Sequence, residues 1–135
     1  MDDQEQQELM WKASFLEKQA QEVQEHLTII NQEIESLYAL NDGLKSLQKS
    51  TEKKIIASIG KGVHVQAHLA SKDLLVDVGA NVLVKKTPAE TQIVIEQQVK
   101  KLVEARMQLL EKLEIYQETL QAMLNTVEHT HGHKH

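Results

Sequence analysis

The sequence predicts an α+β chain in which two long helices of an antiparallel coiled coil flank two central β-hairpins. In both outer segments, apolar residues recur at alternating steps of three and four, which is the spacing of a coiled-coil seam. Between them the pattern changes to strand-like alternation with two glycine-containing gaps, which is typical of hairpins. We expect one domain over residues 1–128, with helices over 4–52 and 88–127 and hairpins within 55–86.

The first helix is predicted from its regular seam. The triplet Asn41-Asp42-Gly43 interrupts this seam with residues of low helix propensity. Because the seam continues beyond it, we favour one continuous or slightly kinked helix in which Asn41 is a buried polar residue that fixes register. A helix end at the triplet is the alternative. The seam residues are Leu9, Ala13, Leu16, Ala20, Val23, Leu27, Ile30, Ile34, Leu37 and Leu44.

Two turn signals divide the middle segment into two hairpins. Gly60-Lys61-Gly62 lies within residues 55–69, and Gly79-Ala80-Asn81 lies within residues 74–86. An isolated hairpin is marginally stable in water, and its unpaired edges invite another chain. We therefore expect the apolar strand residues to form a subunit-assembly surface rather than an intramolecular sheet. These residues are Val63, Val65, Leu69, Leu74, Val76, Val78, Val82 and Val84.

The second helix has a well-marked start and a weaker seam. Thr87 is suited to cap the helix, Pro88 fits its first position, and Glu90 completes a capping box. Arg106 occupies the one seam position that is neither apolar nor aromatic. The other seam residues are Val99, Leu102, Leu109, Leu113, Tyr116, Leu120, Met123 and Val127.

The last seven residues, 129–135, have no apolar pattern and are predicted to be disordered. Their alternating histidines are His129, His131, His133 and His135. Neutral imidazole is a common ligand for zinc, nickel and copper. Because a rigid frame is lacking, we favour adventitious binding, or a remnant added for expression, over a physiological site. We therefore expect neither a metal site nor a cofactor.

Composition argues against several classes of function. The net charge of −5 comes without a clustered basic face, which argues against nucleic-acid binding. The absence of cysteine excludes thiol chemistry and is compatible with a reducing cytosol. No stretch approaches membrane-spanning length, and the acidic amino terminus is unlike an export signal. We therefore expect a cytoplasmic protein that binds neither nucleic acid nor membrane.

Catalysis has little support in the sequence. Gly60-Lys61-Gly62 lies between strands and lacks the spacing of a phosphate-binding loop. The acidic residues alternate with lysine and glutamine on helix faces, which is usual for a solvated surface. We therefore expect no catalytic residue, and an enzyme is a remote alternative.

Apolar residues outside the seams give the sharpest indication of function. Trp11 and Phe15 are four residues apart and share a helix face. Exposed apolar patches usually mark interaction sites, and methionine and aromatic side chains adapt to varied apolar segments. We therefore predict a binding tip where the two helix ends meet; the alternative is that these residues only cover frayed helix ends. The predicted tip residues are Met10, Trp11, Phe15, Met123, Leu124 and Val127.

The middle block, set between two helices, resembles that of the prefoldin alpha subunit. Two hairpins are similar to the alpha type, since beta-type subunits carry one. The resemblance rests on Ile59–Val63, Val65–Ala67, Leu74–Val82 and Lys85–Thr87. The chain departs from the family pattern at Ser58, Lys61 and Asn81, where proline, alanine and glycine are usual. These departures put the turn geometry in question, not the fold.

The resemblance implies a hexamer of two alpha and four beta subunits, whose hairpins form an inter-subunit β-barrel platform carrying six coiled coils. It implies an ATP-independent holdase that binds unfolded proteins at the coil tips, prevents aggregation and transfers them to a group II chaperonin. The expected partners are therefore beta-type prefoldin subunits, unfolded clients and a group II chaperonin. The chain looks closer to an archaeal member.

The alternative function is a coiled-coil tether or assembly scaffold for one defined partner. Asn41 and Arg106, as polar residues in seam positions, would then specify that partner.

Overall fold

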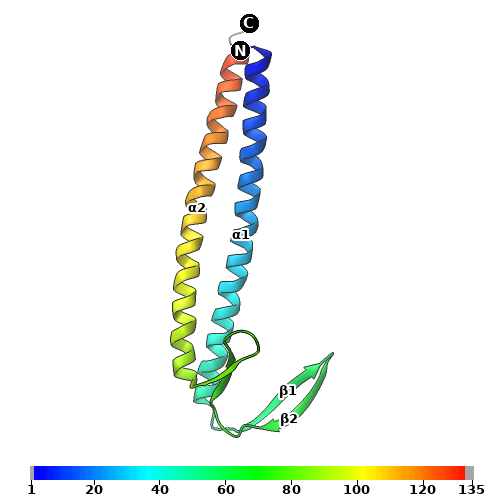
Figure 1. Cartoon of the computed structure of the whole chain (residues 1–135), viewed down its shortest axis with the longest axis vertical. Coiled ribbons are helices and arrows are strands. Elements are labelled where there is room, and N and C mark those ends of the chain that lie inside the picture. Colours follow the sequence, from blue (N-terminus) through cyan, green and yellow to red (C-terminus); the bar gives the residue numbers. More distant parts are fainter. Residues whose placement is uncertain (1, 133–135) are drawn as a thin grey trace. The chain divides into compact units, whose positions relative to one another are not determined.

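The computed structural model describes residues 2–132, with side chains described for residues 2–127. Two long helices flank two antiparallel hairpins, as predicted (Figure 1). The elements in chain order are α1 (Asp3–Lys49), β1 (Lys54–Gly60), β2 (Val63–His68), β3 (Leu74–Asp77), β4 (Leu83–Lys86) and α2 (Pro88–Gly132). They fall into two compact units. The outer unit holds α1 up to Ile34 and α2 from Lys101, and the hairpin unit is Glu35–Lys100.

Helix α1 begins with a side-chain cap and passes through the doubtful triplet without a break. The Oδ1 atom of Asp2 accepts a hydrogen bond from the backbone N–H of Glu5 at 2.8 Å, which satisfies a donor in the first turn. The helix continues through residues 41–43, as we favoured, and ends at Lys49 instead of residue 52. The seam therefore outweighs the low helix propensity of the triplet.

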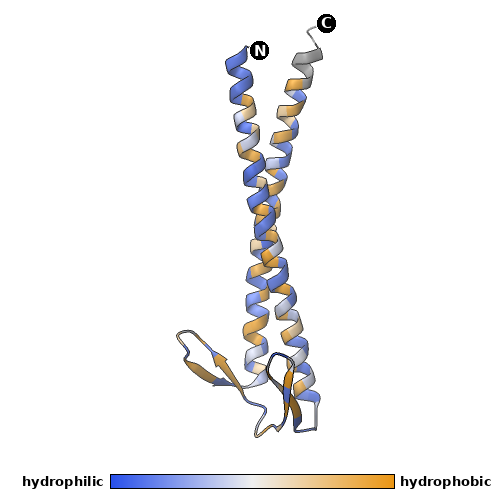
Figure 2. Ribbon diagram, turned by 90° about the vertical axis from the view of Figure 1, so that its right-hand side faces the viewer, coloured by the Kyte–Doolittle hydropathy of each residue, from blue (hydrophilic) through white to orange (hydrophobic). Residues whose placement is uncertain are grey.

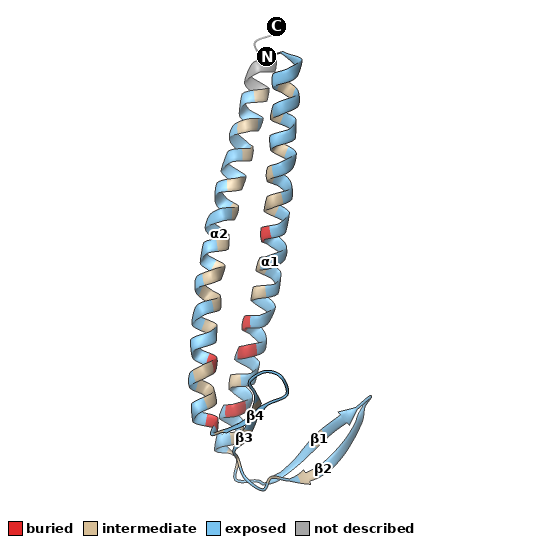
Figure 3. Cartoon of the chain, in the orientation of Figure 1, coloured by how far each residue is buried: buried red, intermediate tan, exposed pale blue. Residues whose placement is uncertain are grey.

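Apart from Pro88 at the start of α2, the buried side chains of the described residues are apolar residues within the two long helices. In the outer unit the buried apolar side chains are Val23 and Ile34, and in the hairpin unit they are Leu37, Leu44 and Ile95 (Figure 3). The four from α1 are all predicted seam residues. In each unit, two antiparallel helical segments thus pack through one row of side chains each, without a globular core.

Polar seam residues differ in how they are satisfied. In the outer unit, Nη1 of Arg106 donates a hydrogen bond to Oδ1 of Asn31 at 3.1 Å, across the helix pair. In the hairpin unit, Oδ1 of Asn41 is buried and has no hydrogen-bond partner among the described residues. Arg106 therefore fixes register within the chain.

The hairpins form two separate two-stranded sheets. In the first, Ala57 pairs with Val65, and the register shifts between Ser58 and Gly60. In the second, Val76 pairs with Val84. The predicted strands were longer by a residue or so at several ends, since Leu69, Val78 and Val82 lie just outside the strands observed.

Both hairpin turns contain pairs of residues with positive φ. These are Lys61 and Gly62, at 50° and 79°, and Ala80 and Asn81, at 51° and 60°. Two central residues with φ > 0 define a type I′ turn, whose twist matches that of antiparallel strands. Lys61 and Asn81, two of the positions where the sequence departs from the family pattern, thus adopt the positive φ that these turns require.

Helix α2 starts as the sequence predicts. The backbone N–H of Glu90 donates to Oγ1 of Thr87 at 3.1 Å, and Pro88 is buried at the first helical position. The helix continues to Gly132, past the predicted end at 127, so residues 129–132 are helical where we expected disorder. Residues 133–135 of the predicted tail lie outside the described part. Over residues 2–132, neither helix is long and apolar enough to cross a membrane.

Candidate binding surfaces on the helix ends and the hairpins

The predicted tip residues, which we call the tip surface, are largely open to solvent. Trp11 is 68% exposed and Phe15 is 50% exposed. Their rings stack with centroids 5.9 Å apart and planes 13° from parallel. Met10 and Leu124 are also exposed, whereas Met123 and Val127 are half-buried. The aromatic pair therefore forms one rigid apolar projection on α1.

The hydrogen bond between Asn31 and Arg106 indicates which residues of the outer unit lie level with one another. In an antiparallel pair the numbers of level residues have a constant sum, here 31 + 106 = 137. By this sum, Met10 lies level with Val127, and Ser14 with Met123. The tip residues of the two helices thus lie at the same end of the outer unit.

The seam near this end is only partly closed. Leu9, Ala13 and Leu16 of α1 are half-buried, as is Leu120 of α2, and along α1 the first buried side chain is Val23 (Figure 3). In Figure 2 the two ribbons part toward the ends of the chain. The tip surface is therefore continuous with seam residues that keep some exposure.

The predicted assembly surface on the hairpins is mostly uncovered in the single chain. The exposed members are Val63, Val65, Val78, Val82 and Val84, and the half-buried ones are Leu69, Leu74 and Val76. In the second hairpin, the paired Val76 and Val84 lie on one face with Leu74. This row of apolar side chains is only partly covered in the single chain, since Leu74 and Val76 are half-buried and Val84 is exposed.

Sequence reasoning missed a second group of exposed apolar residues on the hairpins, Ile55, Ile56, Ile59, Leu75 and Leu83. Ile56 is 73% exposed and Leu75 is 69% exposed. Consecutive strand residues point to opposite faces, so Leu75 lies on the face opposite Val76. The runs Ile55-Ile56 and Leu74-Leu75-Val76 carried this signal, because strands covered on both faces have continuous apolar runs.

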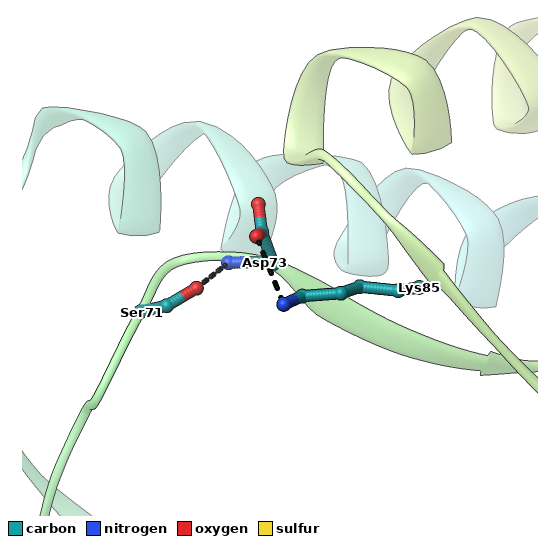
Figure 4. Close-up of polar contacts among 3 residues, drawn as sticks. All are labelled: Ser71, Asp73 and Lys85. Carbon is teal, nitrogen blue, oxygen red and sulfur yellow. Dashed lines mark hydrogen bonds and ion pairs between the residues drawn. The ribbon is translucent and has the colours of Figure 1, made fainter.

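The linker between the hairpins is tied to its neighbours by two charged residues. Nζ of Lys72 donates to the backbone oxygens of Gln48 and Ser50, at 3.2 and 2.5 Å, and so caps the carboxyl end of α1. Nζ of Lys85 lies 3.7 Å from Oδ2 of Asp73, whose backbone N–H donates to Ser71 (Figure 4). Sequence reasoning missed both contacts.

Among the described side chains, no group of three or more His, Cys, Asp or Glu residues is arranged to hold a metal ion. The side chains of the tail histidines lie outside the described ones. The arrangement is suited to binding through apolar contact.

Comparison with known proteins identifies the family. The family described as "Prefoldin subunit" matches residues 16–132. The chain is 24% identical over 85 residues to prefoldin subunit alpha of Methanosphaera stadtmanae, covering 63% of this chain and 62% of that protein. It is 35% identical over 68 residues to prefoldin subunit alpha 2 of Thermococcus kodakarensis, covering 50% and 48%. The matches thus span between about half and three-fifths of these relatives.

The fold is also that of a solved prefoldin. A chain in the cryo-EM structure of filamentous PFD from Methanocaldococcus jannaschii matches with a TM-score of 0.73 at 20% identity, covering 85% of this chain and 98% of that one. This likeness extends over the helices and the hairpins together. With the family match over most of its length, the chain belongs to the prefoldin subunit family.

Proposed function

We propose that the chain is the alpha-type subunit of a cytoplasmic prefoldin complex that holds unfolded proteins without ATP, prevents their aggregation and passes them to a group II chaperonin. Family membership supports a chaperone-type subunit rather than an enzyme. The observation that carries the holding function is the exposed, stacked pair Trp11 and Phe15 at the tip surface. Large exposed aromatic side chains are unusual on a protein without a binding role.

The affinity of one tip surface for a segment of an unfolded protein is expected to be weak. Buried apolar area contributes about 25 cal/mol per Å², and much of this is offset by the entropy lost on association. Several tips on one complex would hold several segments of the same unfolded chain, and the raised effective concentration would supply retention. Release to a chaperonin then needs only competition for the client, with no energy input.

Assembly is proposed to occur through the hairpins, with two copies of this chain and four beta-type subunits. Apolar side chains on both faces of the hairpins support burial by other subunits. The solved neighbour is described as filamentous, so a filament is the alternative assembly. Native mass of the complex from its own cells distinguishes them, since a hexamer has one defined mass and a filament a broad distribution.

The holding function is tested by replacing Trp11 and Phe15 with serine. Because both side chains are exposed, the double variant is expected to keep its fold and assembly but to lose most of its suppression of aggregation. The measurement is light scattering of a denatured client diluted into the assembled complex. Ile29→Ser is the matched control, since Ile29 is 62% exposed on the same helix but away from the tip.

Two results would contradict this assignment. Equal losses of activity in the double variant and in the control would remove the special role of the tip surface. Loss of the assembled complex together with activity would place Trp11 and Phe15 in a structural role.

The tether is less well supported. It relied on Asn41 and Arg106 to specify a partner, and Arg106 is engaged with Asn31 of the same chain. The number of proteins that the chain binds distinguishes the two functions, because a tether binds one folded protein and a holdase binds many unfolded ones.

A further inference from the structure

Charge is distributed unevenly between the two ends of the coil. By the register sum of 137, residues 10–20 lie level with 117–127. Over 2–20 and 117–127 there are six carboxylates, all exposed, and two lysines, Lys12 and Lys18, which gives −6 + 2 = −4. The carboxylates belong to Asp2, Asp3, Glu5, Glu8, Glu17 and Glu118. The apolar tip surface thus lies in an acidic field.

The hairpin segment has the opposite balance. Residues 49–86 contain seven lysines and three carboxylates, which gives +7 − 3 = +4. The acidic character is therefore not shared by the hairpin segment, although α1 carries further carboxylates beyond the tip, at Glu22, Glu25, Glu33, Glu35 and Asp42.

The tip carboxylates form no ion pair with a described side chain, although Lys12 follows Glu8 by four residues on the same helix. Among the described side chains, the one ion pair joins Lys85 to Asp73, far along the chain from the tip residues. Oδ1 of Asp2 accepts the hydrogen bond that caps α1, and none of the six tip carboxylates is ion-paired with a described cationic side chain. Glu8 lies three residues before Trp11, on the same helix face. An apolar segment seated on Trp11 and Phe15 would lie beside this charge.

We propose that the tip surface selects, among unfolded chains, apolar segments flanked by lysine or arginine. This inference rests on the proposed holding function and names the class of client segment that it favours. The apolar residues of the segment cover Trp11 and Phe15, while its flanking cations lie near Glu5, Glu8 and Glu17. Each such contact between exposed charges is weak, but several act together and also speed the encounter.

Salt gives a direct test, because attraction between exposed charges is screened over about 10 Å at 0.1 M and about 3 Å at 1 M ionic strength. The proposed assembly surface on the hairpins is apolar, so added salt should leave the complex assembled. The contrast between low and high salt therefore reports on the tip charge.

The experiment uses the complex assembled from the full chain and its beta-type partner. Three unstructured peptides share one apolar centre and carry flanking lysines, glutamines or glutamates. Their affinities are measured by fluorescence anisotropy at low and at high salt. The lysine-flanked peptide should bind roughly tenfold tighter than the glutamine-flanked one at low salt, and this ratio should shrink to about twofold at high salt.

Two matched triple variants locate the effect. Glu5→Gln, Glu8→Gln and Glu17→Gln together should abolish the preference while leaving the affinity for the glutamine-flanked peptide unchanged. Glu22→Gln, Glu25→Gln and Glu33→Gln together remove the same charge from α1 further from the tip and should keep most of the preference.

The outcomes separate this inference from the function on which it rests. Equal binding of the three peptides, abolished by Trp11→Ser with Phe15→Ser, would overturn the charge preference and leave the holding function standing. Absence of binding for all three peptides would overturn both. A third outcome is that the complexes associate with one another in a salt-sensitive way and show no preference among the peptides. The acidic tip would then bind the lysine-rich hairpin segment of a second copy, and the proposed selection of clients would be overturned.

Discussion

At the scale of single residues, Lys72 shows how one side chain can join elements that are distant in sequence. Its ammonium group binds two backbone oxygens at the end of α1, where carbonyl groups lack helical partners. A cation is also favoured there by the helix dipole. The contact ties the linker between the hairpins to the helix that precedes them.

We expect Lys72→Met to lower the free energy of unfolding by about 1 kcal/mol, because it leaves those oxygens without a charged donor but keeps the apolar stem. The measurement is the urea midpoint of the assembled complex at fixed protein concentration. Lys53→Met is the control, since it removes the same charge from an exposed side chain that makes no hydrogen bond or ion pair within the described part of the chain. Equal midpoints for the two variants would show that the cap contributes nothing.

At this scale, the sequence predicted contacts between residues that are close along the chain and missed contacts between residues that are far apart. The cap by Thr87 and the pairing of Trp11 with Phe15 involve residues three and four apart, so their spacing alone predicted them. Lys72 reaches residues 22 and 24 positions away, and Arg106 reaches Asn31 across 75 positions. Such contacts depend on how the elements pack, which no local pattern encodes.

At the scale of elements, the hairpin turns place ordinary residues where glycine or asparagine is preferred. Ala80 has φ of 51°, a conformation that its Cβ disfavours, whereas asparagine tolerates it. Ala80→Asn should therefore stabilise the second hairpin by roughly 0.5 to 1 kcal/mol. Thermal unfolding of the complex at fixed concentration measures the change.

The control for this turn is Ala70→Asn, an exposed alanine in the linker without positive φ. It should leave the unfolding temperature unchanged. An equal rise for both variants would attribute the effect to the polarity of asparagine and contradict the argument from backbone geometry.

Element boundaries show where pattern reasoning succeeds and fails. The continuity of α1 through Gly43 followed from a seam of long range. Its end at Lys49 did not, because no glycine or proline marks it and Lys72 supplies the cap from elsewhere. The length of α2 was underestimated because the seam stops at Val127 while the backbone stays helical to Gly132.

At the scale of the whole molecule, the hairpins carry the proposed assembly. Val65 lies on the apolar face of the first hairpin, opposite Ala57, and the next residue, Gln66, lies on the other face. An unpaired charge buried in a subunit interface costs several kcal/mol. Val65→Glu should therefore prevent assembly, whereas Gln66→Glu adds the same charge to the same strand and should be tolerated.

Native mass spectrometry of the chain mixed with its beta-type partner reads out both variants. If the Val65→Glu variant assembled fully, the face of the first hairpin that carries Val65 would be excluded from the subunit interface. Failure of both variants would indicate that both faces are covered in the complex, as the exposed Ile56 beside Gln66 would allow.

The partly closed seam of the outer unit has a mechanical consequence. The described seam side chains between Leu9 and Ala20 are only half-buried, whereas Val23 and Ile34 are closed off from solvent and Asn31 is bonded to Arg106. We therefore expect the helix ends to separate at a lower free-energy cost than the segment near Ile34. The outer unit should then open first at its ends, while the bond between Asn31 and Arg106 keeps the two helices in register.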